Sequence, residues 1–167
     1  MLSINKIAKL SHVSYEVKKF LQFYPWKNCK PSFSYQLKKQ LNECKVAIVS
    51  SAGFIVNKKQ KPFDTNIKFG DASYRIIPPN IKSHYLREYQ KSNEFDHAGI
   101  VNDPFSAIPL PHLIDLANEG IIGSVSERHI SLMGATINTS KLLKKTIPDI
   151  INIFKTDEVD IALFIPV

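Results

Sequence analysis

The sequence predicts an α/β fold, with a mostly parallel sheet and helices on both faces in a Rossmann-like three-layer sandwich. Three observations support this prediction. Residues 45–50, "KVAIVS", are a short apolar run typical of buried parallel strands. Residues 157–167, "DEVDIALFIPV", contain a second such run. Helical patterns lie between the two, and strands that alternate with helices favour a parallel sheet.

The N-terminal part of the chain is predicted to be helical. Ser14 can cap a helix whose apolar residues recur at helical spacing as far as Tyr24. Two prolines in "YPWKNCKP" then break the pattern, and Ser34 can cap a second short helix. We expect residues 1–44 to form a helical segment packed on a single α/β domain that spans residues 1–167.

Two further strands are expected in the middle of the chain. "ASYRIIP", ending at Pro78, is a strand candidate, and "HISLMG" at residues 129–134 is a third strand or an extended connector. The polar segment 79–108 is irregular, with a short strand or helix near "SHYLREY". We expect the strands at 74–78 and 159–166 to join residues 45–50 in one largely parallel sheet.

Two helices are expected to cover the sheet. "PLPHLIDLANEG" begins at a proline and stops at Gly120, as helices commonly do. A longer helix opens at Thr139 or Ser140 and runs through Phe154, with a kink or a division into two short helices at Pro148.

Composition and charge exclude several classes of protein. The net charge of +7 comes from lysines spread along the chain, without an arginine-rich stripe, so we expect solvated faces or an anionic small substrate and no nucleic-acid partner. No apolar run reaches the ~18 residues of a membrane span, and the N-terminus lacks a signal-peptide pattern. A cytoplasmic location is therefore expected, with no membrane partner. The two cysteines and five histidines lack metal-ligand spacing, so no metal site is expected.

Several residues in the predicted loops are candidates for a substrate pocket. Ser51, Ala52 and Gly53 follow the first strand, where their N–H groups would hold a carboxylate or form a plain strand-to-helix turn. Asp71 in "GDAS" belongs to the pocket or caps a turn. The other candidates are His97, Asp103, Arg128 and His129.

Chemistry suggests a role for each of these four. His97 and Asp103 fall in the irregular segment, where functional loops concentrate, although a lone histidine is more often a structural hydrogen-bonding group. Arg128 suits a substrate carboxylate because its guanidinium is a planar fork, and His129 suits proton transfer near neutral pH. The alternative for this pair is a capped loop with an exposed arginine.

An ordered set of motifs resembles one family of enzymes. These motifs are "KVAIVSSAGFIV", "KPFD", "GDASYRIIP", "DHAGIVNDPFSAIPLPHLIDLANEGIIGSVSERHISLMG" and "VDIALFIPV". In this order they resemble the selenoprotein B-subunit family of the glycine, sarcosine, betaine and D-proline reductases, over roughly residues 24–167. The chain departs from the family at Pro111-His112, where Asp-Arg is usual, and in a longer segment around "SHYLREYQKSNEF".

The resemblance implies an oxidoreductase of amino-acid metabolism. Relatives run from a "VD-A-L-VPV" strand directly into selenocysteine or cysteine, followed by a helix whose N-terminus favours an anion. We therefore expect the catalytic residue immediately after Val167, in a selenoprotein whose UGA codon is read as a stop. The alternative is a natural short protein. No cofactor is expected in residues 1–167 themselves, and Cys29 and Cys44 do not match the family's redox positions.

Two functions follow from these patterns. The first is a subunit or fragment of a selenocysteine- or cysteine-dependent reductase that cleaves a C–N bond in a small amino-acid-like substrate. Its partners would be that substrate, which carries a carboxylate in the resembling enzymes, and a thioredoxin-like reductant or a partner reductase subunit. The alternative is a non-catalytic α/β binding or assembly module.

Overall fold

The structure, a computed structural model, describes residues 14–23, 35–68, 70–90, 96–134, 136 and 139–167. The chain divides into two compact units, residues 1–36 and 37–167. The first unit contains helix α1, Tyr15–Phe23, in which the Val17 N–H donates to Ser14 Oγ at 3.4 Å. The predicted Ser14 cap is therefore confirmed, while Tyr24 lies outside the described residues. The expected packing of residues 1–44 on the domain stays a prediction.

The prediction of a second short helix is wrong for the residues that the structure describes. Residues 35–40 are not helical, and only a 3₁₀ turn, η2, spans Leu41–Glu43. The backbone of Gln40 is extended, and its N–H donates to the Glu43 carboxylate at 3.1 Å. This local side-chain bond fixes one tight turn before the first strand, and Ser34 lies outside the described residues.

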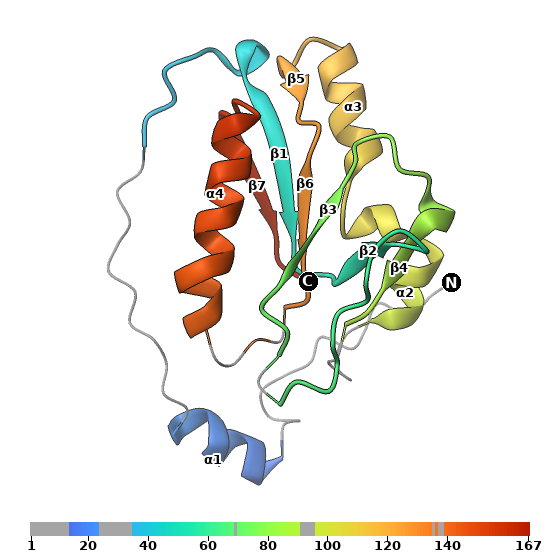
Figure 1. The fold of residues 1–167 in the computed structure, drawn as a ribbon, viewed down its shortest axis with the longest axis vertical. Coiled ribbons are helices and arrows are strands. Elements are labelled where there is room, and N and C mark those ends of the chain that lie inside the picture. The colour runs from blue at the N-terminus through green and yellow to red at the C-terminus, as the bar shows by residue number, and fades with distance from the viewer. Residues whose placement is uncertain (1–13, 24–34, 69, 91–95, 135, 137–138) are drawn as a thin grey trace. The chain divides into compact units, whose positions relative to one another are not determined.

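The second unit is built on a five-stranded sheet that is mixed but mostly parallel, as the sequence predicted in its coarser form (Figure 1). The central strand β1 pairs in parallel with β6 and β5 along one side and with β7 along the other, and β3 pairs antiparallel with β6. The strand bounds are β1 Lys45–Ser50, β3 Tyr74–Ile77, β5 Ser124–Val125, β6 His129–Leu132 and β7 Ile161–Ile165.

One strand runs against the prediction. The strand expected at 74–78 exists as β3, but it is antiparallel to its neighbour β6. A parallel connection needs a crossover of a dozen or more residues, usually a helix. The described residues between 57 and 73 contain no helix, so the chain enters β3 at the edge where β1 ends and runs back.

A small antiparallel ribbon accompanies the main sheet. Strand β2, Phe54–Val56, follows the Ser51–Gly53 loop directly and pairs with β4, Leu86–Glu88. The loop after β1 is therefore a strand-to-strand turn and not the strand-to-helix turn considered from the sequence. Before β4 lies the 3₁₀ turn η3, Ser83–Tyr85. The "SHYLREY" segment therefore contains both a short helical turn and a short strand, the two alternatives expected from the sequence.

Two helices contribute to two separate apolar clusters. Helix α3, Leu110–Asn118, places Leu113 in a cluster with Ile48 of β1. Helix α4, Ile147–Thr156, places Ile150 in a cluster with Val49 of the same strand. Neighbouring residues of a strand point to opposite faces, so each cluster uses its own set of β1 side chains.

The remaining helical segments are short. Helix α2, His97–Asn102, is followed by the 3₁₀ turn η4, Pro104–Ser106. Before α4 lies a π-helical stretch, η5, Leu142–Thr146. In this stretch the Ile147 N–H donates to the Leu142 carbonyl, five residues back, and Pro148 then falls in the first turn of α4, where its missing N–H is tolerated. No helix in the described part of the chain is both long and apolar enough to cross a bilayer.

Candidate functional site

The three parallel strands β1, β6 and β7 end at the same edge of the sheet, and the loop after β1 joins them there (Figure 1). The Ser51 N–H donates to the Ile165 carbonyl of β7 at 3.1 Å, and the Gly53 N–H donates to the Leu132 carbonyl of β6 at 2.8 Å. In open α/β sheets, ligands bind beyond this carboxyl edge. The Ser51–Gly53 loop therefore lies where a ligand site is expected.

The end of β7 is attached to this loop by a side chain. The Val167 N–H donates to Ser51 Oγ at 2.9 Å, and the same hydroxyl lies 3.3 Å from the Val167 carbonyl, to which it can donate. Val167 therefore lies at the same edge of the sheet as the Ser51–Gly53 loop.

The loop does not offer the free N–H groups that the carboxylate hypothesis needs. Ser51 and Gly53 donate to strand carbonyls, and the Ala52 N–H donates to Ser50 Oγ at 3.3 Å. The Ser50 hydroxyl in turn donates to the Ala107 carbonyl at 2.7 Å. All three N–H groups are thus used within the protein, and the loop is held rigidly without forming an anion nest.

A buried glutamine holds the loop against the end of β6. Gln90 is only 8% exposed, and its Nε2 donates to the Ser51 carbonyl at 3.2 Å and to the Met133 carbonyl at 2.5 Å. Gly134 makes this close approach feasible, because a Cβ there would lie 2.9 Å from the Ser51 carbonyl oxygen. Its φ of +67° also lies in the left-handed region that favours glycine.

A cavity of about 270 Å³ opens beside this loop at the carboxyl edge. Its apolar wall includes Leu132 and Leu142, and Thr146 Oγ1 fixes the neighbouring backbone by donating to the Ala72 carbonyl at 2.6 Å. The residues that line the cavity are Ser51, Asp71, Ala72, Leu132, Gly134, Thr136 and Leu142.

Asp71 is the only ionisable side chain among these lining residues, and it is almost fully buried. Its two carboxylate oxygens accept hydrogen bonds from the Asp64 N–H at 3.0 Å and the Ser73 N–H at 2.9 Å. Burial on its own would raise the pKa of Asp71, but these hydrogen bonds and the nearby Arg75 lower the pKa below its usual value. Asp71 therefore combines the two predicted roles, because it ties the turn together and also puts a negative charge in the pocket wall.

Arg75 supports the same turn from the other side. Its guanidinium donates to the Lys61 carbonyl at 2.7 Å and to the Pro62 carbonyl at 3.0 Å. It also lies 4.1 Å above the centre of the Phe63 ring, a cation–π contact. The "KPFD" and "GDASYR" motifs are thus one structural unit beside the cavity.

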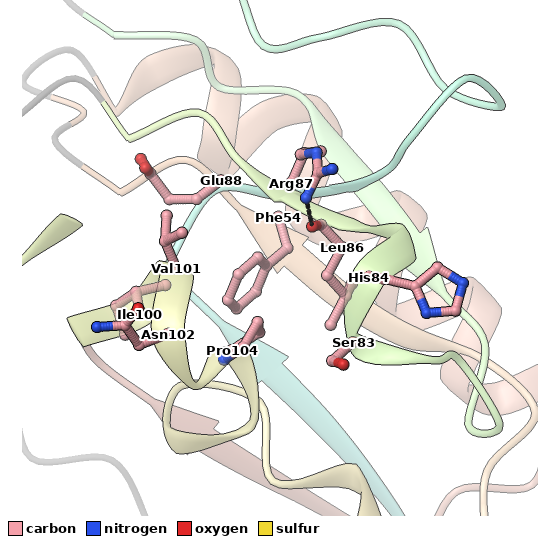
Figure 2. A pocket seen from close by; sticks show the side chains of 10 residues that line it. All are labelled: Phe54, Ser83, His84, Leu86, Arg87, Glu88, Ile100, Val101, Asn102 and Pro104. Carbon is pink, nitrogen blue, oxygen red and sulfur yellow. Dashed lines mark hydrogen bonds between the residues drawn. The ribbon is translucent and has the colours of Figure 1, made fainter. Parts of the chain in front are cut away.

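His97 and Asp103 belong to a different part of the surface. His97 Nδ1 lies 2.9 Å from Glu88 Oε2, and Asp103 Oδ1 accepts the Phe105 N–H at 3.1 Å as the cap of η4. Between β4 and α2 lies a second cavity of about 260 Å³, with the Phe54 ring at its centre (Figure 2). In this view the side chains of His84 and Glu88 point away from the ring, so the centre of the cavity is apolar.

Arg128 lies at the opposite, amino edge of the sheet. It directly precedes β6, and its guanidinium binds both carboxylate oxygens of Asp157, with Nε to Oδ2 at 2.7 Å. This pairing raises the pKa of Arg128, and the hydrogen bonds from Arg128 lower the pKa of Asp157. The planar fork predicted for a substrate carboxylate is thus occupied by a carboxylate of the protein itself.

His129 is fully buried in the sheet and does not approach the cavity edge. Its Nδ1 accepts a hydrogen bond from the Ile48 N–H at 3.0 Å. Ile48 lies between the part of β1 that pairs with β5 and the part that pairs with β6, so the imidazole replaces a strand partner there. Burial lowers the pKa of His129 to about 4, with a weak opposing effect from the Ser126 main chain. The imidazole is therefore neutral at physiological pH and acts as a structural acceptor.

The structure brings two of the predicted residues, Ser51 and Asp71, to one cavity, with Ala52 and Gly53 in the adjoining loop. The sequence reasoning missed Gln90 and Gly134. Gly134 had a signal, because a glycine ends the strand pattern "HISLMG". Gln90 had none, because it lies in a polar segment whose apolar pattern gives no sign of burial.

Comparison with known proteins adds no relative: no family model, no curated protein and no solved structure matches this chain. The structure therefore defines the class of protein only as an α/β protein with a mixed, mostly parallel sheet. In the described part of the chain, no three His, Cys, Asp or Glu side chains gather as a metal site would require. Function has to be inferred from the chemistry of the carboxyl-edge cavity, because fold alone does not specify it.

Proposed function

We propose that this chain supplies the substrate pocket of a selenocysteine- or cysteine-dependent reductase of the glycine, betaine and D-proline reductase type, located in the cytoplasm. One observation carries the proposal. The end of β7, the Ser51 loop and the buried carboxylate of Asp71 lie together at the carboxyl edge of the sheet, beside one cavity. The two apolar clusters on alternate β1 side chains support the Rossmann-like three-layer arrangement that such a site requires.

The resembling enzymes place their selenolate or thiolate directly after the strand that corresponds to β7. Val167 is hydrogen-bonded to Ser51, which lines the cavity, and the next Cα lies ~3.8 Å farther along the chain. A nucleophile at that position would stand at the rim of the cavity. A helix beginning there would stabilise the anion through its N-terminal N–H groups.

The chemistry proposed is reductive cleavage of a C–N bond. The selenolate attacks the substrate α-carbon, so that a C–Se bond forms as the C–N bond breaks and the amine leaves. A thiol then attacks selenium, and the carbon fragment takes a proton while a Se–S bond forms. A thioredoxin-like dithiol or a partner subunit supplies the two electrons that reduce this bond.

Asp71 gives the pocket a preference for one end of the substrate. Its carboxylate is the only charge among the lining side chains, and Leu132 and Leu142 provide apolar surface beside it. A positively charged amine is therefore favoured near Asp71. The carboxylate of an amino-acid substrate finds no free N–H in the Ser51–Gly53 loop and would face the open side of the cavity.

The cysteine that the structure describes is poorly suited to act as the redox nucleophile. Cys44 is fully buried, and its Sγ donates to the Gln40 carbonyl at 3.1 Å. Burial raises the pKa of Cys44, which disfavours the reactive thiolate. We therefore expect the 167-residue chain alone to show no dithiol-driven reduction of glycine, betaine or D-proline.

The proposal is tested on the protein isolated from its source. Peptide mass spectrometry is expected to find the "ALFIPV" peptide continuing directly into selenocysteine or cysteine, with the isotope pattern of selenium in the first case. A different residue after Val167, or dithiol-driven turnover by the 167-residue chain that Cys29→Ser or Cys44→Ser abolishes, would refute the proposal.

A non-catalytic binding or assembly module is the second candidate. It is favoured by the structural roles of Arg128, His129 and Asp103, whose polar atoms bond to other parts of the protein. The same peptide experiment separates the two functions, because a binding module needs no redox residue after β7.

A further inference from the structure

Strand β7 forms an open edge of the main sheet. It pairs with β1 over residues Ile161–Ile165, and no strand in the described part of the chain pairs with its other side. The segment from Ile161 to Val167 contains no charged residue. Natural proteins usually protect such edges with charges, bulges or covering elements, because an open edge can pair with another strand.

The side chains of β7 are exposed on both faces of the sheet. Phe164 is 69% exposed and Leu163 is 40% exposed. Phe164 shares a face with Ala162, since both are in register with residues of β1 two positions apart. The largest and the smallest side chains of the strand are therefore next to each other on one face.

We propose that a second copy of the chain pairs with this edge, β7 to β7, in antiparallel orientation about a twofold axis at Leu163. In that register Phe164 of each copy lies opposite Ala162 of the other, so the largest exposed side chain covers the smallest. Registers centred on Phe164 would oppose the two phenylalanines and leave both Ala162 positions uncovered. The strand is thus self-complementary in one register, as a twofold interface requires.

The charges at the strand's start permit this pairing. Asp160 is already neutralised by Lys39, with Nζ to Oδ1 at 2.7 Å, and it also accepts the Lys45 N–H at 2.9 Å. In the proposed register the Asp160 residues of the two copies lie six positions apart, or ~20 Å. Each lies opposite Pro166 of the other copy, so the two Asp160 carboxylates do not meet.

The dimer is expected to be weak. Two five-residue strands bury less than the ~1,600 Å² of a standard interface, so monomer and dimer should exchange in a concentration-dependent equilibrium. Sedimentation velocity of the full 167-residue chain over a wide concentration range should give one dimeric species. Phe164→Lys should raise the dimer dissociation constant by at least about tenfold, because it puts a charge in place of the ring that the dimer would bury.

Val101→Lys is the matched control, since Val101 on α2 is 65% exposed and is not part of β7. It adds the same charge and should leave the dissociation constant unchanged. Because both positions are exposed, neither variant should alter the circular dichroism spectrum. If the control weakens the dimer as much as Phe164→Lys does, the effect comes from net charge and the proposal fails.

A pair of variants tests the register itself. Ala162→Phe should weaken the dimer by opposing two phenylalanines, and Ala162→Phe with Phe164→Ala should restore it by exchanging the large and small positions. Monomer at every concentration, aggregates larger than a dimer, or no recovery in a folded double variant would overturn the proposal. β7 would then be an edge for a different protein or for a later part of the chain.

Discussion

The two edges of the main sheet use polar groups in opposite ways. At the amino edge, Arg128 pairs with Asp157 and Lys39 pairs with Asp160, so charges are neutralised by other charges. At the carboxyl edge, Gln90 connects backbone carbonyls, and the charge of Asp71 lies in a cavity wall with no salt bridge to any described residue. Residue type alone suggested Arg128 as a substrate ligand, but the direction of the strands decides which charge faces a cavity.

This difference predicts that the carboxyl edge is the more sensitive to changes in shape. Gly134→Ala puts a methyl group 2.9 Å from the Ser51 carbonyl oxygen at a φ of +67°. We expect a loss of about 3–4 kcal/mol in the free energy of unfolding, from strain and steric overlap together. Urea denaturation measures this loss.

Gly120→Ala is the control for that measurement. Gly120 has a similar φ of +70°, but no atom lies within 4 Å of its added Cβ. Its cost should be only about 1–2 kcal/mol from the backbone conformation. Equal losses in the two variants would mean that the close approach of the two loops contributes nothing.

Between the two edges, His129 should make stability depend on pH. The pKa of His129 is lowered to about 4 in the folded protein against 6.5 for the ordinary group. The unfolded chain therefore binds the proton first, and the stabilisation, complete above pH 6.5, is lost as the pH falls towards 4. The free energy of unfolding should fall by roughly 3 kcal/mol over this pH range.

The measurement for His129 is the free energy of unfolding as a function of pH. His129→Phe should be less stable at neutral pH, because the Ile48 N–H loses its acceptor, and it should show a shallower slope between pH 4 and 6.5. An unchanged slope would show that His129 is not the titrating group.

Removing the Gln90 bridge should have a smaller effect. Gln90→Leu replaces the amide side chain with a shorter, branched apolar one and leaves the Ser51 and Met133 carbonyls without their shared donor. We expect a cost of about 2 kcal/mol in urea denaturation. Amide hydrogen exchange should increase at Gly53 more than at Val46, and uniform exchange across β1 would argue against a local role.

Changes at the amino edge should have the smallest effect. Asp157→Asn breaks an ion pair at a partly exposed arginine, where solvent screening reduces the gain. Because the pairing lowers the pKa of Asp157, its contribution is present above the ordinary carboxyl pKa and disappears as the pH falls below it. The variant should therefore differ from the parent at pH 7 and match it in acid, and a difference that persists in acid would point to packing.

Local patterns in the sequence identified the core strands, while contacts between distant residues decided the rest. The "KVAIVS" and "DIALFI" runs specify β1 and β7, and Pro111 and Gly120 bracket α3. The reversal of β3 was not predictable in this way, because it depends on how the turn before it packs. Burial of Gln90 and His129 likewise comes from partners 39 and 81 residues away, which no local pattern encodes.

The candidate site could be predicted only in part for the same reason. Ser51 and Asp71 were found because they follow or precede strands, which is a local property. Arg128 was misplaced because its partner Asp157 is 29 residues away, at the end of α4. Whether a charged side chain has a partner is a tertiary property, and it separates a structural residue from a candidate ligand.

The proposed function requires the carboxyl edge to bind a small substrate that carries an amine or a quaternary ammonium group. It is tested most directly by a ¹⁵N–¹H NMR titration of the full chain with glycine, betaine and D-proline. We expect saturable shifts at the amides of Ser51, Asp71 and Gly134 for at least one of these compounds, with the amides of Arg128 and Asp157 unmoved. Shifts centred on Arg128, shifts confined to the cavity around Phe54, or no saturable shift with any of the three compounds would contradict it.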